Sequence, residues 1–284
     1  MIEPLQSDDA LLADIVSRKS DGGFRLWWLG QSGYLLQWSG RHFLIDPYLS
    51  ESLTKKYAQT DKPHVRMTRR AIDPARLDFI DVVSSSHNHT DHLDAETLVP
   101  LLHANPQIKL IIPEANRAFV AGRLKIDAAI PLGMDAGLTF SESGFSITAI
   151  PAAHEKFDRD AQGRHPYLGY VIRFGDWSLY HSGDTILYDG MAARLTRFKI
   201  DIALLPINGA RPERRVAGNL DGREAAQLAK DIGARCVIPC HYDMFEFNTA
   251  RPEDEFIRVC KALKQRFRVL RTGERFESTE LETS

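Results

Sequence analysis

The residues best suited to chemistry in this sequence are three histidines and an aspartate that fall within six positions. His87, His89, Asp91 and His92 follow the apolar run 79–83, which is typical of a buried strand. Neutral imidazole nitrogens and carboxylate oxygens are ligands for zinc and its first-row neighbours. A loop that leaves the carboxyl end of a strand can direct several closely spaced side chains to one point. The cluster therefore predicts a metal site, and a histidine-rich surface turn is the alternative.

Three further candidates each follow an apolar run later in the chain, namely His154, Asp184 and His241. Strands of one sheet that point the same way bring such ends together. The whole set then contains more ligands than one tetrahedral ion needs, and enough for two. We expect His87, His89 and His154 to hold a first ion, Asp91, His92 and His241 to hold a second, and Asp184 to bridge both.

A pair of ions gives this site a definite chemistry. Two divalent cations roughly 3.5–4 Å apart can share a water molecule and lower its pKa to about 7, which yields a bridging hydroxide nucleophile at neutral pH. We expect Asp91 to be catalytic as well as a ligand, because its carboxylate can orient the nucleophile or relay its proton to the leaving group.

Size and composition limit the alternatives. The chain has 284 residues, of which 43% are hydrophobic, and its 36 basic side chains nearly balance 38 acidic ones. This balance gives no general attraction to nucleic acid or to a membrane surface. No apolar run reaches the roughly 18 residues of a membrane span, and the N-terminus lacks a secretory pattern. Three cysteines do not form a disulfide framework, so a cytoplasmic protein is expected.

The order of elements is that of a layered α/β protein, and the absence of linkers predicts one domain over residues 1–284. Periodicity and capping residues predict helices at 7–19, 95–99, 114–124, 221–232 and 253–264. Pro100 is expected to kink or end the second of these. Strands are predicted at 24–29, 34–38, 42–45, 79–83, 109–113, 137–140, 145–150, 167–174, 178–180, 201–207 and 235–239.

The pattern His-x-His-x-Asp-His, followed by a later His, Asp and His, resembles the metallo-β-lactamase-fold hydrolase superfamily. Within it, the sequence is most similar to the L-ascorbate-6-phosphate lactonase family over residues 24 to 260. The shared segments are Trp27-Trp28-Leu29-Gly30, residues 87–94, residues 178–184, Val237-Ile238-Pro239 before His241, and Ala250-Arg251-Pro252. His154 departs from that family and matches the wider superfamily.

The resemblance implies a four-layer αββα sandwich and a cytoplasmic hydrolase that uses zinc or manganese, with iron as a further candidate. A lactonase that acts on a small polar lactone or ester, with or without a phosphate group, is the expected activity, and a homo-oligomer is an open option. A phosphodiesterase or nuclease on the same fold is the alternative. A diiron oxidoreductase would want a carboxylate where His89 stands, and the full ligand set argues against a non-catalytic binding protein.

Other polar residues are candidates for supporting roles. Asp46, at a strand end, either orients a ligand histidine or is a turn carboxylate. His165 is either an exposed loop residue or a substrate contact, and His181 is expected to pack behind the ligands. Arginines can clamp a phosphate or carboxylate group, although most such residues are solvated. The candidates for this role are Arg211 together with Arg66, Arg69, Arg214 and Arg215.

Overall fold

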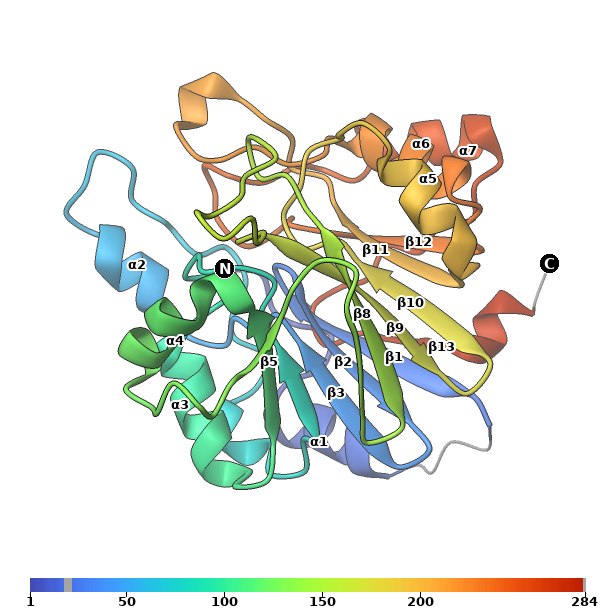
Figure 1. Cartoon of the computed structure of the whole chain (residues 1–284). Helices are drawn as coiled ribbons and strands as arrows, with labels where there is room; N and C mark the ends of the chain where they lie inside the picture. Colours follow the sequence, from blue (N-terminus) through green and yellow to red (C-terminus); the bar gives the residue numbers. More distant parts are fainter. Residues whose placement is uncertain (18–21, 283–284) are drawn as a thin grey trace.

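The centre of the molecule is a pair of β-sheets packed face to face, as a computed structural model describes it for residues 1–17 and 22–282 (Figure 1). The first sheet has the order β13-β1-β2-β3-β4-β5-β6, and the second has the order β12-β11-β10-β9-β8-β7. The strands of the first sheet are β1 (Phe24–Gly30), β2 (Gly33–Trp38), β3 (Arg41–Ile45), β4 (Val82–Ser84), β5 (Lys109–Pro113), β6 (Leu132–Met134) and β13 (Arg275–Glu277). Those of the second are β7 (Thr139–Glu142), β8 (Phe145–Pro151), β9 (Leu168–Phe174), β10 (Trp177–His181), β11 (Ile202–Pro206) and β12 (Cys236–Cys240).

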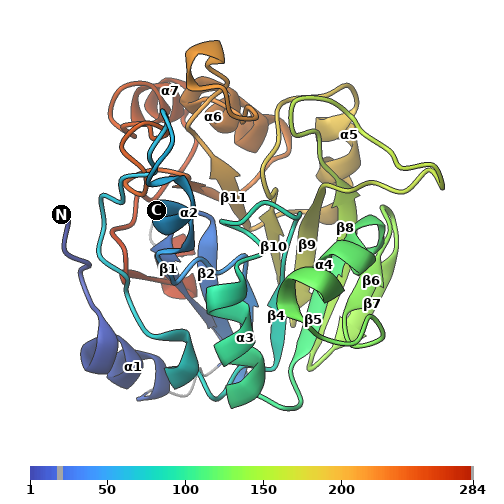
Figure 2. The same ribbon diagram turned by 90° about the vertical axis from the view of Figure 1, so that its left-hand side faces the viewer.

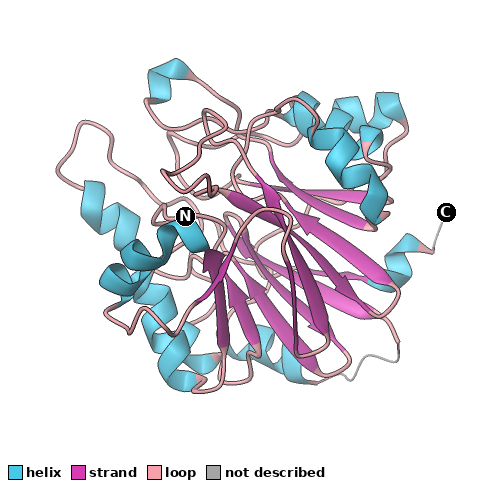
Figure 3. Cartoon of the chain, viewed as in Figure 1, coloured by secondary structure: helices cyan, strands magenta, loops and turns pink. Residues whose placement is uncertain are grey.

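Helices cover the outer face of each sheet (Figure 3). The first sheet is covered by α1 (Asp8–Val16), α3 (Ala95–Ala104) and α4 (Arg117–Leu124), and the second by α5 (Met191–Leu195), α6 (Gly222–Asp231) and α7 (Phe256–Leu263). Short helices elsewhere are α2 (Ser52–Tyr57), η1 (Pro74–Arg76), η2 (Glu114–Asn116), η3 (Thr196–Phe198), η4 (Pro212–Arg214) and η5 (Ser278–Leu281). The predicted four-layer αββα arrangement is confirmed. None of the described helices is long and apolar enough to cross a bilayer.

Strand β1 shows why the sequence builds two apolar layers. Side chains alternate between the faces of a strand, so an uninterrupted apolar run is buried on both sides. Phe24 and Trp28 point into the core between the sheets, whereas Trp27 and Leu29 pack with the helices outside the first sheet. The aromatic and aliphatic residues of β1 therefore pack both into the core between the sheets and against the outer helices.

The directions of the strands explain where functional side chains can gather. In the first sheet, β1 and β3 both run antiparallel to β2, and β3 is parallel to β4. In the second, β8 and β10 both run antiparallel to β9, and β10, β11 and β12 are parallel. The carboxyl ends of β1, β3 and β4 therefore share one edge, as do those of β8, β10 and β12.

Direct contacts hold these two edges against each other. The Leu168 N–H donates to the Ser86 carbonyl at 3.0 Å, and the Tyr170 hydroxyl donates to the Ser85 carbonyl at 3.1 Å. Gly183 has a φ of +60°, and a Cβ there would come within 2.7 Å of the Ser86 Cβ. Glycine is required at this position because the backbone is left-handed and the opposite sheet leaves no room for a side chain.

Several predicted boundaries are wrong. The strand after residue 79 is confined to β4, and the last helix begins at Phe256 rather than after Pro252. The predicted helix 7–19 ends at Val16, and its last predicted positions fall outside the described residues. Helix α3 continues through Pro100 to Ala104. Pro100 has no N–H to donate to the Glu96 carbonyl four residues earlier. Glu96 is exposed, so water can donate a hydrogen bond to that carbonyl instead.

Asp94 fixes the start of α3 directly after the histidine cluster. Its carboxylate accepts hydrogen bonds from the Glu96 N–H at 3.3 Å and from the Thr97 hydroxyl at 2.5 Å. The Thr97 oxygen in turn accepts from the Leu49 N–H at 2.8 Å. This buried chain of hydrogen bonds ties the helix, the cluster and the loop after β3 together.

We therefore expect Asp94→Ala to lower the free energy of unfolding by about 1–3 kcal/mol, because a helix cap is lost and a buried hydroxyl loses its acceptor. Urea denaturation followed by circular dichroism measures this change. The control is Asp254→Ala, which removes an exposed carboxylate 3.8 Å from Arg251 and should change stability by less than about 0.5 kcal/mol. Equal effects of the two substitutions would contradict this role for Asp94.

Candidate metal centre

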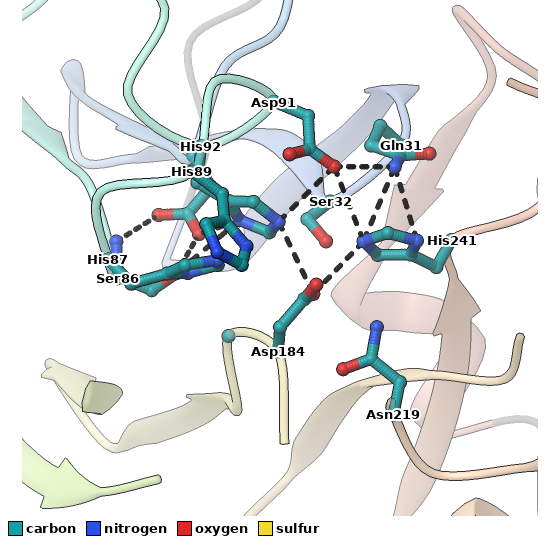
Figure 4. A network of polar contacts seen from close by, with 12 residues as sticks. Gln31, Ser32, Ser86, His87, His89, Asp91, His92, Asp184, Asn219 and His241 are labelled. Atoms are coloured by element: carbon teal, nitrogen blue, oxygen red, sulfur yellow. Dashed lines mark hydrogen bonds and ion pairs between the residues drawn. The ribbon is translucent and has the colours of Figure 1, made fainter. Parts of the chain in front are cut away.

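The loop of residues 85–94 holds its histidines by bonding to itself. The Ser85 hydroxyl lies 2.9 Å from the carbonyl of His87 and 2.7 Å from that of His92, and it can donate to either. The Leu93 N–H donates to the carbonyl of His89 at 2.8 Å. These bonds curl the backbone so that several imidazole rings point to the same side of the loop (Figure 4).

The structure brings together all seven side chains that the sequence singled out. Their nitrogen and oxygen atoms form three groups, each with its atoms within 4.8 Å of one another. The groups are His87 with His89 and His154, then Asp91 with His92 and His241, and finally His87 with His92 and Asp184. The first two match the trios predicted for two ions, and the role of these residues as ligands remains a prediction.

Asp184 lies between the two trios and presents a different oxygen to each. Its Oδ1 atom is 3.3 Å from His92 Nε2 and 3.0 Å from His241 Nε2, both in the second trio. Its Oδ2 atom is 3.7 Å from His154 Nε2, which belongs to the first. Figure 4 shows the Asp184 carboxylate between the His241 ring and the cluster loop. A carboxylate in this position is suited to bridge two cations.

Three ligand-type atoms at this point are buried without a well-aligned hydrogen bond among the described residues. They are His87 Nε2, His92 Nε2 and Asp184 Oδ1, of which the last two lie 3.3 Å apart. The other ring nitrogens are anchored: His87 Nδ1 lies 3.0 Å from the Ser86 hydroxyl, and His154 Nδ1 lies 2.9 Å from the Gly218 carbonyl. Buried polar atoms are costly without partners, and a metal-bound imidazole is normally held through its second nitrogen. The residues therefore fit divalent cations.

Burial also sets the protonation state that metal binding needs. It lowers the pKa of His87 well below the ordinary histidine value, and the neighbouring His92 and His89 lower it further. It lowers the pKa of His89, and it lowers that of His154 to about 4. These three rings are therefore neutral at pH 7, with nitrogen lone pairs available for a metal.

The second trio has the opposite electrostatics. Burial raises the pKa of Asp184, but His241 and His92 outweigh burial and hold it well below the ordinary value. Burial also raises the pKa of Asp91, and His92 and His241 again lower it overall. Burial lowers the pKa of His92, yet Asp184 and Asp91 raise it well above the ordinary value. The buried Asp184 and the half-buried Asp91 thus favour positive charge here, which a proton or a metal cation can supply.

Asp46 contacts His92, in agreement with the first of its two predicted roles. It follows β3, and its carboxylate is 2.7 Å from His92 Nδ1. The Ser86 N–H donates to the other oxygen, Oδ1, at 2.9 Å, and the Ser86 hydroxyl donates to Oδ2, the oxygen that contacts His92. Asp46 has a φ of +40°, and His241 has a φ of +66°. Such left-handed backbone is strained for residues other than glycine, and it concentrates at functional sites.

Gln31 is a residue of this site that the sequence analysis missed. It occupies the turn between β1 and β2, with a φ of +52°. Its Nε2 atom donates to Asp91 Oδ2 at 2.8 Å and lies 3.1 Å from His241 Nδ1 (Figure 4). Gln31 thus links the cluster loop to the end of β12. The available signal was its position, because it follows a strand end as the other site residues do.

His181 and His165 lie away from this centre. The His181 ring is buried, where its Nε2 is 3.1 Å from the Ser32 carbonyl and its Nδ1 accepts from the Gly183 N–H at 3.3 Å. The expectation that it packs behind the cluster agrees with these contacts. His165 is only 5% exposed, so the exposed-loop interpretation is wrong, and it lines a different cavity. Phe157 packs against its ring at a centroid distance of 4.6 Å and shields it.

Most of the candidate arginines also point elsewhere. Arg211 lines two neighbouring cavities and does not line the one over the cluster. Arg66 and Arg214 are buried and donate to backbone carbonyls. Arg69 forms ion pairs at the surface. Arg215 does line the cavity over the cluster, where it pairs with Asp61.

A cavity of about 590 Å³ opens over the cluster. Its wall includes His89, Asp91, His154, Asp184 and His241. The remaining wall contains aromatic and basic side chains that the sequence analysis did not assign to the site, namely Tyr57, His64, Phe119, Phe245, Lys56 and Arg123. The cavity has the size of a small-molecule pocket.

Comparison with known proteins gives the class of this chain. Residues 41–242 match the family model described as the Beta-lactamase superfamily domain. A structure described as the metallo-beta-lactamase fold protein YhfI from Bacillus subtilis superimposes with a TM-score of 0.65 at 17% identity, covering 91% of this chain and 100% of that one. Igni18, a metallo hydrolase from Ignicoccus hospitalis, gives a TM-score of 0.65 at 22% identity and covers 90% and 98%. The metallo-β-lactamase fold is thus confirmed.

Curated relatives narrow the assignment further. A protein of Methanosarcina mazei named UPF0173 metal-dependent hydrolase is 30% identical over 242 residues, which cover 84% of this chain and 91% of the relative. A protein of the same name from Opitutus terrae is 33% identical over 225 residues, covering 77% and 85%. The chain therefore belongs to the beta-lactamase superfamily, among relatives named metal-dependent hydrolases. The finer likeness to the L-ascorbate-6-phosphate lactonases remains a prediction.

The contact between Asp46 and His92 leads to a prediction about metal binding. Asp46→Asn weakens the partner that fixes the His92 ring, and loss of such a partner typically costs about 10–100-fold in metal affinity. Competition with a chromophoric chelator measures the affinity for zinc and for manganese. The matched control is Asp201→Asn, since Asp201 is also a buried carboxylate and accepts from the Ser178 N–H at 2.8 Å, outside the cluster. Equal affinities in the two variants would refute the positioning role of Asp46.

Proposed function

We propose that this chain is a dinuclear metal-dependent hydrolase, most directly a lactonase that acts on a small polar lactone or ester, with or without a phosphate group. The observation that carries the proposal is the convergence of two trios of ligand-type side chains on Asp184, where buried ring nitrogens and carboxylate oxygens face one another. We further propose that the whole chain forms one hydrolase domain, since both sheets contribute to this set.

The proposed ligands are His87, His89 and His154 for one ion, Asp91, His92 and His241 for the other, and Asp184 for both. Mixed imidazole and carboxylate donors suit zinc and manganese, and they also accommodate iron. When bound, such a pair of cations polarises a carbonyl group and makes hydroxide available at neutral pH.

Asp91 is the residue to which we assign a direct catalytic role. Its side chain is 16% exposed and lines the cavity, so it can reach both an attacking water and a leaving group. Gln31 holds its Oδ2 atom at 2.8 Å and fixes the orientation of the carboxylate. The depressed pKa keeps Asp91 ionised at neutral pH, so its carboxylate can accept a hydrogen bond from the nucleophile.

The cavity walls support a small substrate. About 590 Å³ accommodates one drug-sized molecule, and Lys56, Arg123 and Arg215 can attract a phosphate or carboxylate group on it. Tyr57 and Phe245 supply apolar surface on the same wall. Nucleic acid is less favoured as a partner because the net charge is −2.

Metal analysis combined with a substrate panel tests the proposal. We expect about two equivalents of divalent metal per chain. We also expect hydrolysis of small lactones, complete loss of activity after chelation, and recovery when zinc or manganese is returned. Bis-para-nitrophenyl phosphate and RNA belong in the same panel. Turnover of the diester without turnover of any lactone would replace the lactonase proposal by the phosphodiesterase alternative, and a protein that neither contains nor responds to metal would end both.

Substitution of Asp91 tests its assigned role. We expect Asp91→Asn to lower kcat by about 10²–10⁴, because the amide cannot accept the proton of the nucleophile. Steady-state kinetics at saturating metal, together with the metal content of the variant, separate a lost proton acceptor from a lost ligand. The control is Asp243→Asn. Asp243 lies two positions after His241, and in the described part of the chain its carboxylate accepts no hydrogen bond from the cluster. An unchanged kcat in the Asp91 variant would show that Asp91 is not catalytic.

A further inference from the structure

A second cavity, of about 370 Å³, lies apart from the metal centre and shares no lining residue with the cavity over it. The loop that follows His154 and the segment α5–η3 form much of its wall. Both segments lie at one end of the second sheet (Figure 2). Four arginines line it, namely Arg159 and Arg164 from the loop and Arg194 and Arg197 from the helical segment.

Three of these arginines have no acidic partner. Arg164 pairs with Asp160 at 2.8 Å and approaches Glu114 at 3.7 Å. Within residues 1–17 and 22–282, by contrast, no carboxylate lies within ion-pair distance of Arg159, Arg194 or Arg197. Like charges gathered around one cavity repel each other, and an anion between them relieves that repulsion.

His165 lies in the buried part of the cavity and contributes no negative charge to it. The residue is 5% exposed, and its Nδ1 donates to the Asp158 carbonyl at 2.9 Å, which leaves Nε2 as the free nitrogen. Burial lowers the pKa of His165, the charges of Arg159 and Arg194 lower it further, and the hydrogen bond to Asp158 and the charge of Asp135 oppose this shift. All three charged residues line the same cavity as the ring.

Asp135 is the one carboxylate among the described residues that line the cavity. Its Oδ1 atom is buried and accepts no hydrogen bond in the described part of the chain. The Asp135 side chain as a whole is half-buried, and its carboxylate can accept a hydroxyl donor of a ligand in the cavity. The cavity thus combines several cationic donors with one carboxylate acceptor.

We propose that this cavity binds a small organic phosphate monoester, with its phosphate between Arg159, Arg194 and Arg197 and a hydroxyl group on Asp135. Guanidinium groups from separate segments suit a tetrahedral group with three terminal oxygens better than a planar carboxylate, which one arginine can satisfy with two parallel bonds. The site lies outside the hydrolytic centre, so it does not depend on the function proposed above.

Calorimetric titration of the metal-loaded protein at constant ionic strength tests this site, with glycerol 3-phosphate and inorganic phosphate as the titrants. We expect saturable binding of glycerol 3-phosphate that is tighter than that of inorganic phosphate. The variant Arg194→Gln/Arg197→Gln should weaken it by about tenfold or more, because two charge-assisted contacts are lost. Both side chains are exposed, and thermal unfolding verifies that the variant remains folded.

Two further variants serve as controls. Arg258→Gln removes an exposed arginine of α7 and should leave the affinity unchanged. His87→Ala alters the metal centre and should also leave it unchanged. The proposal is overturned if no binding saturates below about 10 mM, if Arg258→Gln weakens binding as much as the double variant, or if only His87→Ala abolishes it. Equal affinities for the two titrants would overturn the organic ester and leave free phosphate as the ligand.

Discussion

The shared direction of the strands is the constraint on which the site depends. The carboxyl ends of β1, β3 and β4 in one sheet face those of β8, β10 and β12 in the other, and each is followed by a polar residue of the centre. No single segment holds the complete set of proposed ligands. The loop of residues 85–94 supplies four of them, and the second sheet supplies the other three from separate strand ends. Close contact between the sheet edges, as between Leu168 and Ser86, is therefore part of the site itself.

Burial gives these side chains a charge distribution that they would not have in water. The first trio is neutral because desolvation disfavours protonated imidazole, whereas Asp91 in the second trio and Asp184 between the trios favour positive charge. The network around the trios is also fixed, with Asp46 against His92 and Gln31 against both Asp91 and His241. The side chains of the centre are thus held in place without an ion or substrate. Such preorganisation lowers the free-energy cost of binding.

Local patterns in the sequence predicted the order of strands and helices and the seven site residues, whereas the four-layer arrangement was predicted from the resemblance to the metallo-β-lactamase-fold hydrolases. Apolar runs marked the strands, and polar residues after those runs marked the site edge. Short elements such as β6 and β13 were missed, since three residues are too few to show a period. Gln31 and His165 could not be assigned because their surroundings come from distant segments: the end of β12 for Gln31, and Phe157 packed on the His165 ring. Arg211 was misplaced because composition does not show which way a loop faces.

The pairing of β13 with β1 joins nearly opposite ends of the chain. Beside this pair, the Phe24 N–H donates a hydrogen bond to the Ser278 hydroxyl, and the two residues are 254 positions apart. During translation, β1 therefore leaves the ribosome long before the strand that covers its outer edge. An uncovered edge is a template for unwanted association between chains. The nascent protein must pass through this vulnerable interval on every round of synthesis, and chaperones that shield open sheet edges would act at that stage.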